Sequence, residues 1–395
     1  MALSGNNTLT GKQTVLSLTA IYTTVFTWGI SFAGLIPLMA LTLENNGEST
    51  VRIGIMGAIT PIGVILAAPY VPAIVQRLGT SKAIFVTNVL AMITVALLPV
   101  FDSYGGWLAL RFASGLAGAV PWIVTESWLN AIAPEEKRSR VTALYGAVMA
   151  ASFATGPFIL TVIGIDGVMP YVYCAGAMAI SIVPLILIWN LAPTLSLSKG
   201  LKLSGFMRTM PTLLAAALVC GMVDMSLFSF LPIWGLRVGF TEDLSLLLLS
   251  IFVLGNVVLQ LPIGWIADHT NKRMVLLVCG VVAVIGPIFV TVLSGNLLAM
   301  GAVLFLWGGC AWALYTVSLA MLGQRFQGSG LTAASAVFVI AYEIANVVGP
   351  PAAGYAIELW EPHGLMVFMG LSALAFVILL CVRGIVRVRH SQESI

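Results

Sequence analysis

The segment GWIADHTNKR, residues 264–273, decides how this chain folds, because it is a short polar turn between two long apolar stretches. The stretch before it covers about residues 244–266, and the stretch after it covers about residues 274–293. Each has close to the roughly 20 apolar residues that a helix needs to cross about 30 Å of hydrocarbon. The segment therefore predicts a tight turn between two membrane-spanning helices.

Ten further apolar stretches bring the predicted number of spans to twelve. In the first half of the chain they cover about residues 15–41, 53–75, 83–101, 106–132, 141–165 and 171–191. In the second half they cover about residues 211–236, 297–322, 331–357 and 365–382. Only 8% of the residues are charged, against about 25% in an ordinary globular domain. Lipid, unlike water, tolerates so apolar a surface.

Lysine and arginine are distributed unevenly over the loops, and this predicts the orientation of the chain. With the N-terminus in the cytoplasm, 15 of the 18 Lys and Arg residues fall in cytoplasmic segments. Arg52 and Arg237 fall on the opposite side, and Arg111 lies within a span. We therefore expect both termini to be cytoplasmic.

The two halves of the chain carry related features at a nearly constant offset, which predicts an internal repeat. Gln76, after the second span, aligns with Asp268, after the eighth, at an offset of 192 residues. Gly156 and Gly349, each followed by a proline, are offset by 193 residues.

We therefore expect an all-α membrane protein whose twelve transmembrane helices form two pseudo-symmetric six-helix bundles. The expected parts are a bundle at residues 1–191, a cytoplasmic linker at 192–209, and a bundle with a short cytoplasmic tail at 210–395.

The loop motifs of the chain resemble those of the major facilitator superfamily. The motif between spans eight and nine is matched by Gly264, Asp268, Lys272 and Arg273. Its counterpart between spans two and three is degraded. Arg77 and Gly79 remain there, whereas Pro72 replaces the glycine and Gln76 replaces the acid.

Further motifs extend the resemblance over essentially the whole chain. Arg111-Phe-Ala-Ser-Gly115 resembles the span-four motif, with Ser114 in place of a longer polar residue. Gly156-Pro157 and Gly349-Pro350 resemble the proline motif of the proton-coupled antiporters. Glu126-Ser127 and the span that contains Trp307 look like the YcaD-like bacterial branch. The resemblance implies a secondary transporter of a bacterial cytoplasmic membrane that works by alternating access.

In the superfamily, the acid of the second loop motif meets the N-terminus of span five, where helix N–H groups attract a carboxylate. Here Asp268 would meet Arg138, Ser139 and Arg140 as a gate contact, although these residues would also serve as solvated topology charges. Glu126, near the cytoplasmic end of span four, is expected to contact the loop arginines. The Gly-Pro pairs are expected to bend their helices during conformational exchange; ordinary kinks are the alternative.

Four residues of charged type lie within spans, where burial of a charge costs at least about 2.5–3.5 kcal/mol, so they are functional candidates. They are Arg111, Glu126, Asp224 and Glu343. The resemblance implies that span seven lines a cavity, so Asp224 is a candidate for proton or substrate binding; a polar tether between helices is the alternative. Arg111 stays charged at any relevant pH and needs an anionic partner, either Asp224, Glu343 or a substrate anion.

Polar and aromatic side chains complete the expected site. Glu343 is flanked by Tyr342 and Asn346, which are one turn apart and offer a shared polar face. In span one, Thr24 and Thr27 belong to a possible hydrogen-bonding stripe, although Ser and Thr often bond their own helix. Candidate cavity aromatics are Trp28, Trp122, Trp312 and Tyr315.

Several functional classes are disfavoured. The five cysteines lie in apolar stretches without metal-ligand spacing, and the three histidines lie outside the spans, so we expect no metal and no cofactor. An intramembrane serine protease needs a His within the spans, and none is present there. An intramembrane aspartyl protease needs two Asp within the spans, and Asp224 stands alone. We therefore expect no enzyme. The net charge of +3 does not indicate nucleic acid binding.

The expected partners are a small-molecule substrate, protons and the lipid bilayer, and we expect a monomer. Proton-coupled export of amphiphilic, drug-like compounds is slightly favoured by the proline motifs. Proton-coupled uptake of a small metabolite, anionic metabolites included, and lipid flipping are alternatives within transport. A non-transporting sensor or assembly factor is the alternative outside it.

Overall fold

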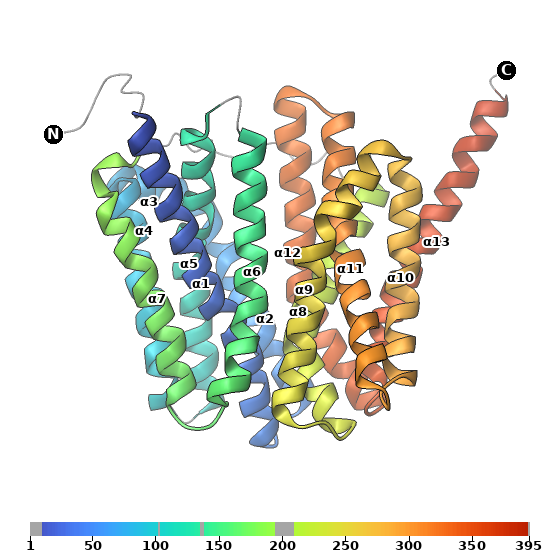
Figure 1. The fold of residues 1–395 in the computed structure, drawn as a ribbon, viewed down its shortest axis with the longest axis horizontal. Helices are drawn as coiled ribbons and strands as arrows, with labels where there is room; N and C mark the ends of the chain where they lie inside the picture. The colour runs from blue at the N-terminus through green and yellow to red at the C-terminus, as the bar shows by residue number, and fades with distance from the viewer. Residues whose placement is uncertain (1–9, 102, 135–137, 194–208, 394–395) are drawn as a thin grey trace. The chain divides into compact units, whose positions relative to one another are not determined.

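The computed structural model describes residues 10–101, 103–134, 138–193 and 209–393, and every regular element in these ranges is a helix (Figure 1). In the first half the helices are α1 (Gly11–Asn45), α2 (Thr50–Ala67), α3 (Val71–Leu78), α4 (Thr80–Leu97), α5 (Tyr104–Ile132), α6 (Arg138–Ile163) and α7 (Met169–Leu187). In the second half they are α8 (Pro211–Arg237), α9 (Glu242–His269), α10 (Lys272–Val292), α11 (Leu297–Arg325), α12 (Gly328–Leu359) and α13 (Gly364–Glu393). Three 3₁₀ turns are η1 (Ala68–Tyr70), η2 (Leu98–Val100) and η4 (Trp189–Leu191).

Within the described ranges, twelve helical segments are long and apolar enough to cross a membrane, as the sequence predicts. Their ends differ from the predicted ends by at most four residues. The second span, Thr50–Leu78, joins α2, η1 and α3. Pro69 and Pro72 lie at the starts of η1 and α3, where a proline that lacks an N–H interrupts the α-helical hydrogen bonds.

The helices pack into two compact units. Unit 1 comprises residues 1–35, 59–156 and 165–200, and unit 2 comprises 36–58, 157–164 and 201–395. Unit 2 thus contains the end of α1 and the start of α2, because these segments pack on α8 and α12. The predicted linker at 192–209 falls almost entirely outside the described residues, as do the ends of the chain at 1–9 and 394–395.

Glycines form the closest helix crossings in each unit. In unit 1, Gly63 of α2 faces Gly115 of α5, and a Cβ on either would strike the backbone of the other helix. In unit 2, Gly255 of α9 and Gly308 of α11 lie against the backbone of Phe305 and Phe252 in the same way. In membranes, small residues at an interface let helix backbones approach closely. Gly255 follows Gly63 by 192 residues and Gly308 follows Gly115 by 193, so the sequence offset recurs in the packing.

The glycines of the two Gly-Pro pairs also lie at helix crossings. Gly156 of α6 packs on Gly34 and Ile30 of α1, within unit 1. Gly349 of α12 packs on Met222 and Ser226 of α8, within unit 2. Both α6 and α12 continue through the prolines that follow. The close helix packing predicted for these pairs is therefore present, whereas their role in conformational exchange stays a prediction.

Gly349→Ala tests whether this crossing carries stability. The added Cβ would lie 2.9 Å from Met222 Cα and 2.9 Å from Ser226 Oγ, and the backbone atom cannot move aside. We expect a loss of about 1–3 kcal/mol, as for other overpacked contacts, measured as a lower apparent melting temperature in detergent.

Gly146→Ala is the matched control, because Gly146 is also helical and a Cβ there meets nothing within 4 Å. It should leave the melting temperature unchanged or raise it, since alanine favours a helix by up to about 1 kcal/mol over glycine. Equal melting temperatures for the two variants would contradict the packing role of Gly349.

Candidate functional site

A buried carboxylate lies in the middle of unit 2. Asp224 of α8 is 5% exposed, and the Tyr342 hydroxyl of α12 donates a hydrogen bond of 2.5 Å to its Oδ2. Its Oδ1 is buried and has no hydrogen-bond partner among the described residues. Buried polar atoms are rarely left without a partner. One oxygen of Asp224 is therefore held in place, and the other is available.

A second acid stands beside this pair. Asn346, one turn after Tyr342 on α12, donates through Nδ2 to Glu343 Oε2 at 3.3 Å. The Oδ1 of Asn346 is buried and lacks a partner within the described ranges. The predicted shared face of Tyr342 and Asn346 is thus present, and the two side chains hold different acids, Asp224 and Glu343.

Aromatic rings border the two acids. Tyr315 of α11 meets Tyr342 edge to face, with 5.1 Å between ring centroids, and meets Phe338 at 4.9 Å. Trp312 lies 6.5 Å from Tyr342. Tyr315 and Trp312, predicted as cavity aromatics, are therefore next to the predicted acids.

The described basic residues of unit 2 lie at helix ends, away from the middle of the spans. Those whose side chains the structure describes are Arg52 near the start of α2, Arg237 at the end of α8, Lys272 and Arg273 at the start of α10, Arg325 at the end of α11, and Arg383 late in α13. The described interior of unit 2 therefore carries two carboxyl groups and no cationic side chain.

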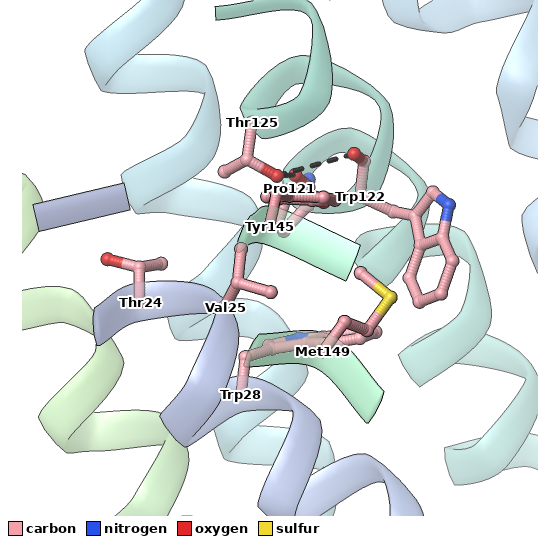
Figure 2. Close-up of a pocket in the computed structure, with 8 residues that line it drawn as sticks. All are labelled: Thr24, Val25, Trp28, Pro121, Trp122, Thr125, Tyr145 and Met149. Carbon is pink, nitrogen blue, oxygen red and sulfur yellow. Dashed lines mark hydrogen bonds between the residues drawn. The ribbon is translucent and has the colours of Figure 1, made fainter. Parts of the chain in front are cut away.

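Unit 1 contains a hollow between α1, α5 and α6 (Figure 2). It is small: its enclosed part has room for about one water molecule, and the rest of the space between these side chains is open to the surroundings. Its lining is aromatic and apolar apart from two threonines and consists of Thr24, Val25, Trp28, Pro121, Trp122, Thr125, Tyr145 and Met149. Sequence analysis named Thr24, Trp28 and Trp122 but missed the contribution of α6, because Tyr145 and Met149 carry no motif.

The aromatic side chains of this hollow are held by one another. Trp28 stacks on Phe32 at 5.1 Å and meets Trp122 edge to face at 5.5 Å. Thr24 donates to the Ser181 carbonyl of α7 at 3.1 Å, so its hydroxyl ties two helices together. Thr27 donates to the Thr23 carbonyl of its own helix at 2.9 Å. Two hydroxyl groups of the predicted hydrogen-bonding stripe therefore donate to backbone carbonyls of helices.

Glu126 lies on α5, one turn after Trp122, and its side chain is exposed. It is within electrostatic range of Tyr145. No ion pair of Glu126 occurs among the described residues, Arg140 included. The side chain of Arg138 lies outside the described part, so the expected contact with loop arginines stays a prediction.

Arg111 is buried in unit 1, with 3% of its surface exposed. Its carbonyl accepts a hydrogen bond from Thr60 of α2, and its guanidinium lies in electrostatic range of Cys174 of α7. No hydrogen bond or ion pair of the guanidinium is found within the described part of the chain. The anionic partner that the sequence calls for therefore stays a prediction.

The loop-motif residues have distinct local roles. Gly79 ends α3 with φ 80° and ψ 159°, a backbone conformation that is essentially confined to glycine. Lys272 Nζ donates to Asp268 Oδ1 at 3.0 Å, and Arg273 Nη2 donates to the Leu380 carbonyl of α13 at 2.8 Å. Gly264 and Arg77 make no comparable contact in the described ranges. The predicted meeting of Asp268 with span five stays a prediction.

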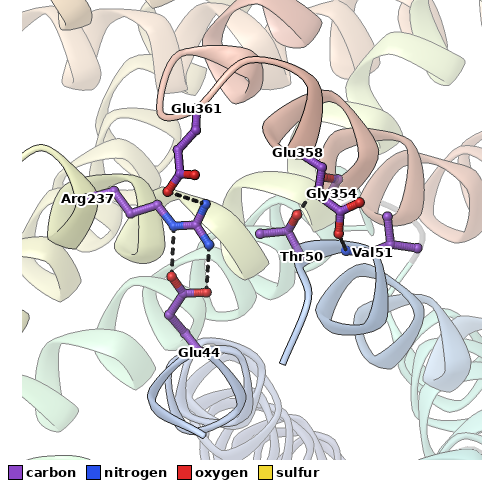
Figure 3. Close-up of polar contacts among 7 residues, drawn as sticks. All are labelled: Glu44, Thr50, Val51, Arg237, Gly354, Glu358 and Glu361. Carbon is purple, nitrogen blue, oxygen red and sulfur yellow. Dashed lines mark hydrogen bonds and ion pairs between the residues drawn. The ribbon is translucent and has the colours of Figure 1, made fainter. Parts of the chain in front are cut away.

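Unit 2 also contains an ionic cluster that sequence analysis missed (Figure 3). Arg237, at the end of α8, donates from Nε and Nη2 to the two carboxylate oxygens of Glu44, at 2.7 and 3.0 Å. Its Nη1 lies 3.0 Å from Glu361 Oε1. Next to it, Thr50 donates to the Gly354 carbonyl at 2.6 Å, and the Val51 N–H donates to Glu358 at 3.3 Å.

These contacts join the end of α1 and the start of α2 to α8 and α12. We call this set of contacts the end clasp: Glu44, Thr50, Val51, Arg237, Gly354, Glu358 and Glu361. The sequence feature that pointed to this cluster was Arg237, because it is one of only two basic residues predicted on the side of the membrane opposite the termini. Its partners could not be found because their loops are far apart in sequence.

A fold of twelve apolar helices with ionisable side chains inside the spans is that of a multi-pass membrane transporter. Comparison with known families agrees, because the model of the Major Facilitator Superfamily matches residues 21–313 and 213–394. The chain belongs to the major facilitator superfamily.

Bacterial relatives match most of the chain. The chain is 23% identical over 352 residues to YfkF of Bacillus subtilis strain 168, an uncharacterized MFS-type transporter, covering 87% of this chain and 89% of YfkF. It is 22% identical over 355 residues to the MFS-type transporter YcaD of Escherichia coli O45:K1, covering 89% and 91%. The expected resemblance to the YcaD-like branch is thereby confirmed.

Solved structures share the fold. A mutant of the nucleoside transporter NupG matches with a TM-score of 0.74 and 11% identity, over 94% of this chain and 99% of NupG. A D-xylose-proton symporter matches with a TM-score of 0.70 and 12% identity, over 93% and 96%. At these identities the likeness concerns the fold alone.

Glu44→Gln tests the end clasp. Arg237 would lose a carboxylate that is itself only 17% exposed, and hydrogen bonds to charged groups contribute about 1.5–3 kcal/mol each. We expect the apparent melting temperature in detergent to fall by several degrees.

Glu48→Gln is the matched control, because it breaks the Glu48–Arg52 pair, in which the Arg52 side chain is 47% exposed. An exposed pair of this spacing contributes about 0.5 kcal/mol or less, so its melting temperature should hardly change. If both variants melt at the same temperature, the end clasp does not stabilise unit 2.

Proposed function

We propose that this protein is a secondary active transporter that moves a small organic solute across the bacterial cytoplasmic membrane in exchange for protons. Membership of the major facilitator superfamily supports transport of a small molecule. The observation that carries the coupling is Asp224, a buried carboxyl group with one oxygen bound to Tyr342 and the other without a described partner.

Asp224 is suited to take up and release a proton. When it is ionised, Oδ2 accepts the hydrogen bond of Tyr342. A proton that binds at Oδ1 neutralises the group without breaking that bond, because Oδ1 has no partner to lose among the described residues. Ionisable residues inside a membrane are costly, and they commonly belong to proton or substrate pathways. Glu343, held by Asn346, is the second acid that we assign to this pathway.

Export of amphiphilic compounds is the direction and the substrate type that we favour. The Gly-Pro pairs resemble the proline motif of proton-coupled antiporters. We further propose that both termini are cytoplasmic, as the excess of Lys and Arg on that side favours, and that the protein acts as a monomer.

Uptake of a small anionic solute is the second candidate. It is favoured by Arg111, a buried guanidinium for which no ionic partner is found within the described ranges. A substrate carboxylate or phosphate would supply the missing counter-charge.

Asp224→Asn tests the coupling. The protein is reconstituted into liposomes with an acidic lumen and trapped pyranine, and amphiphilic compounds of positive, neutral and negative charge are added outside. With the unaltered protein, we expect at least one compound to drive proton efflux. Because asparagine cannot carry the proton, Asp224→Asn should lower that efflux by at least about tenfold and still exchange the same labelled compound without a gradient.

Asp243→Asn is the control, because Asp243 is an exposed carboxylate in the first turn of α9. It should behave like the unaltered protein. Full proton efflux in both Asp224→Asn and Glu343→Gln would contradict the assignment of the coupling site. Further acidification of the lumen that only anionic compounds drive would favour the second candidate, because proton-coupled uptake moves the anion and the proton in the same direction.

A further inference from the structure

Two buried oxygen atoms without a partner lie at the crossing of α8 and α12. Asp224 is 5% exposed and Asn346 is 3% exposed. Among the described residues, neither Asp224 Oδ1 nor Asn346 Oδ1 has a hydrogen-bond partner. Because buried polar atoms are rarely left unpaired, two of them at one crossing indicate a ligand that binds to oxygen.

The two helices touch at this crossing through their backbones. A Cβ at Gly221, one turn before Asp224, would strike the Tyr342 carbonyl and lie 3.3 Å from the backbone nitrogen of Asn346. The Tyr342 hydroxyl reaches from α12 to Asp224, and Asn346 is one turn further along the same face of α12. Asp224 and Asn346 therefore belong to the same crossing.

Neighbouring side chains fix the direction of the two unpaired oxygens. Tyr342 donates to the other oxygen of Asp224, Oδ2, and the Nδ2 of Asn346 donates to Glu343 at 3.3 Å. Each Oδ1 therefore points away from the partner that holds its side chain. A ligand that binds to both Oδ1 atoms leaves both of these hydrogen bonds intact.

The charge at this crossing is negative. Asp224 and Glu343 are in electrostatic range of each other. The described Lys and Arg residues of unit 2 lie at helix ends, so none of them neutralises these acids. Acidic residues inside a span usually have a partner of opposite charge or belong to an ion pathway. The ligand that fits the two oxygens is therefore a cation.

The ligand atoms favour a small monovalent cation. Carboxylate and amide oxygens bind hard cations. Ca²⁺ takes about six to eight oxygens, commonly from several carboxylates, whereas the described residues contain no group of three or more His, Cys, Asp or Glu that could hold a metal ion. One carboxylate and one neutral amide oxygen balance a single positive charge. Backbones too close for a Cβ at Gly221 favour Na⁺ over the larger K⁺.

We propose that the crossing of α8 and α12 binds Na⁺ through Asp224 Oδ1 and Asn346 Oδ1, with Tyr342 and Glu343 as positioning residues. Tyr342 and Glu343 are half-buried, so the ion and its remaining water ligands can reach the crossing along these side chains. The inference rests on the proposed function, in which Asp224 carries the coupling. It names Na⁺ as a second ion that Asp224 takes in place of the proton.

Equilibrium binding of radioactive Na⁺ to the full-length protein in detergent tests the proposal. The measurement is made by scintillation proximity at one alkaline pH, with choline chloride added to keep the ionic strength constant. We expect saturable binding that unlabelled Na⁺ displaces. K⁺ should displace it at least about tenfold less effectively.

Asp224→Asn removes the charge but keeps the shape of the side chain and an acceptor for Tyr342. It should weaken Na⁺ binding by at least about tenfold, because the only charged ligand is lost. Asn346→Leu keeps a side chain of similar size without the oxygen, and it should weaken binding by at least about threefold.

Asn88→Leu is the matched control for Asn346→Leu. Asn88 of α4 is also buried, its Nδ2 donates to Ser181 Oγ at 2.8 Å, and its Oδ1 has no partner among the described residues. Its amide is held by a hydroxyl and not by a carboxylate, so this variant should bind Na⁺ like the unaltered protein.

Size-exclusion profiles and melting temperatures identify any variant that fails to fold. If either leucine variant does not fold, Asp224→Asn still decides the question. Its control is Asp243→Asn, which removes an exposed carboxylate in the first turn of α9 and should leave Na⁺ binding unchanged.

Three results would each overturn the proposal: no saturable Na⁺ binding by the unaltered protein, unchanged affinity in Asp224→Asn or Asn346→Leu, and displacement by K⁺ as effective as by Na⁺. The assay uses no gradient and no transported compound, so its failure would leave proton-coupled transport untouched. Conversely, Na⁺ binding that depends on Asp224 without any proton flux in liposomes would overturn the coupling proposal and leave the Na⁺ site standing.

Discussion

Close approach of helix backbones at glycine is the constraint on which each unit depends. Lipid is as apolar as the helix surfaces, so burying leucine or valine between two helices gains little in a membrane. Close approach adds dispersion contacts along the crossing, and it needs residues without a side chain. Gly63 with Gly115, and Gly255 with Gly308, bring helices so close that a Cβ would strike the opposite backbone. Their offsets of 192 and 193 residues show that both halves use the same crossing.

The cost of charge in hydrocarbon explains where the polar side chains are. Most described Lys and Arg residues lie at helix ends, where water and lipid headgroups solvate them. There Arg237 forms a forked pair with Glu44, which is stronger and more directional than a point-charge contact and ties the end of α1 to the end of α8. Inside the spans, Tyr342 holds Asp224, and Glu126 stands beside aromatic rings. Because an apolar residue at position 224 would avoid the penalty of burial, Asp224 is the residue that we propose to act in coupling.

The number of spans, their ends to within four residues, and the internal repeat all follow from sequence patterns. Hydrocarbon thickness sets the length of an apolar helix, and the same packing solution in both halves requires matching glycines at matching positions. Asp224, Tyr342, Glu343 and Asn346 were also predictable as candidates, because polar residues are conspicuous inside apolar stretches.

What only the tertiary structure decided is which of these side chains meet. The sequence placed Tyr342 and Asn346 on one face of α12, but the hydrogen bond from Tyr342 to Asp224 depends on the crossing of α8 and α12. In the same way, Glu44 meets Arg237 across 193 residues of chain. A sequence pattern with helical period shows which residues share a face of one helix. The distance between residues on different helices depends on how those helices pack, and no local sequence pattern contains that information.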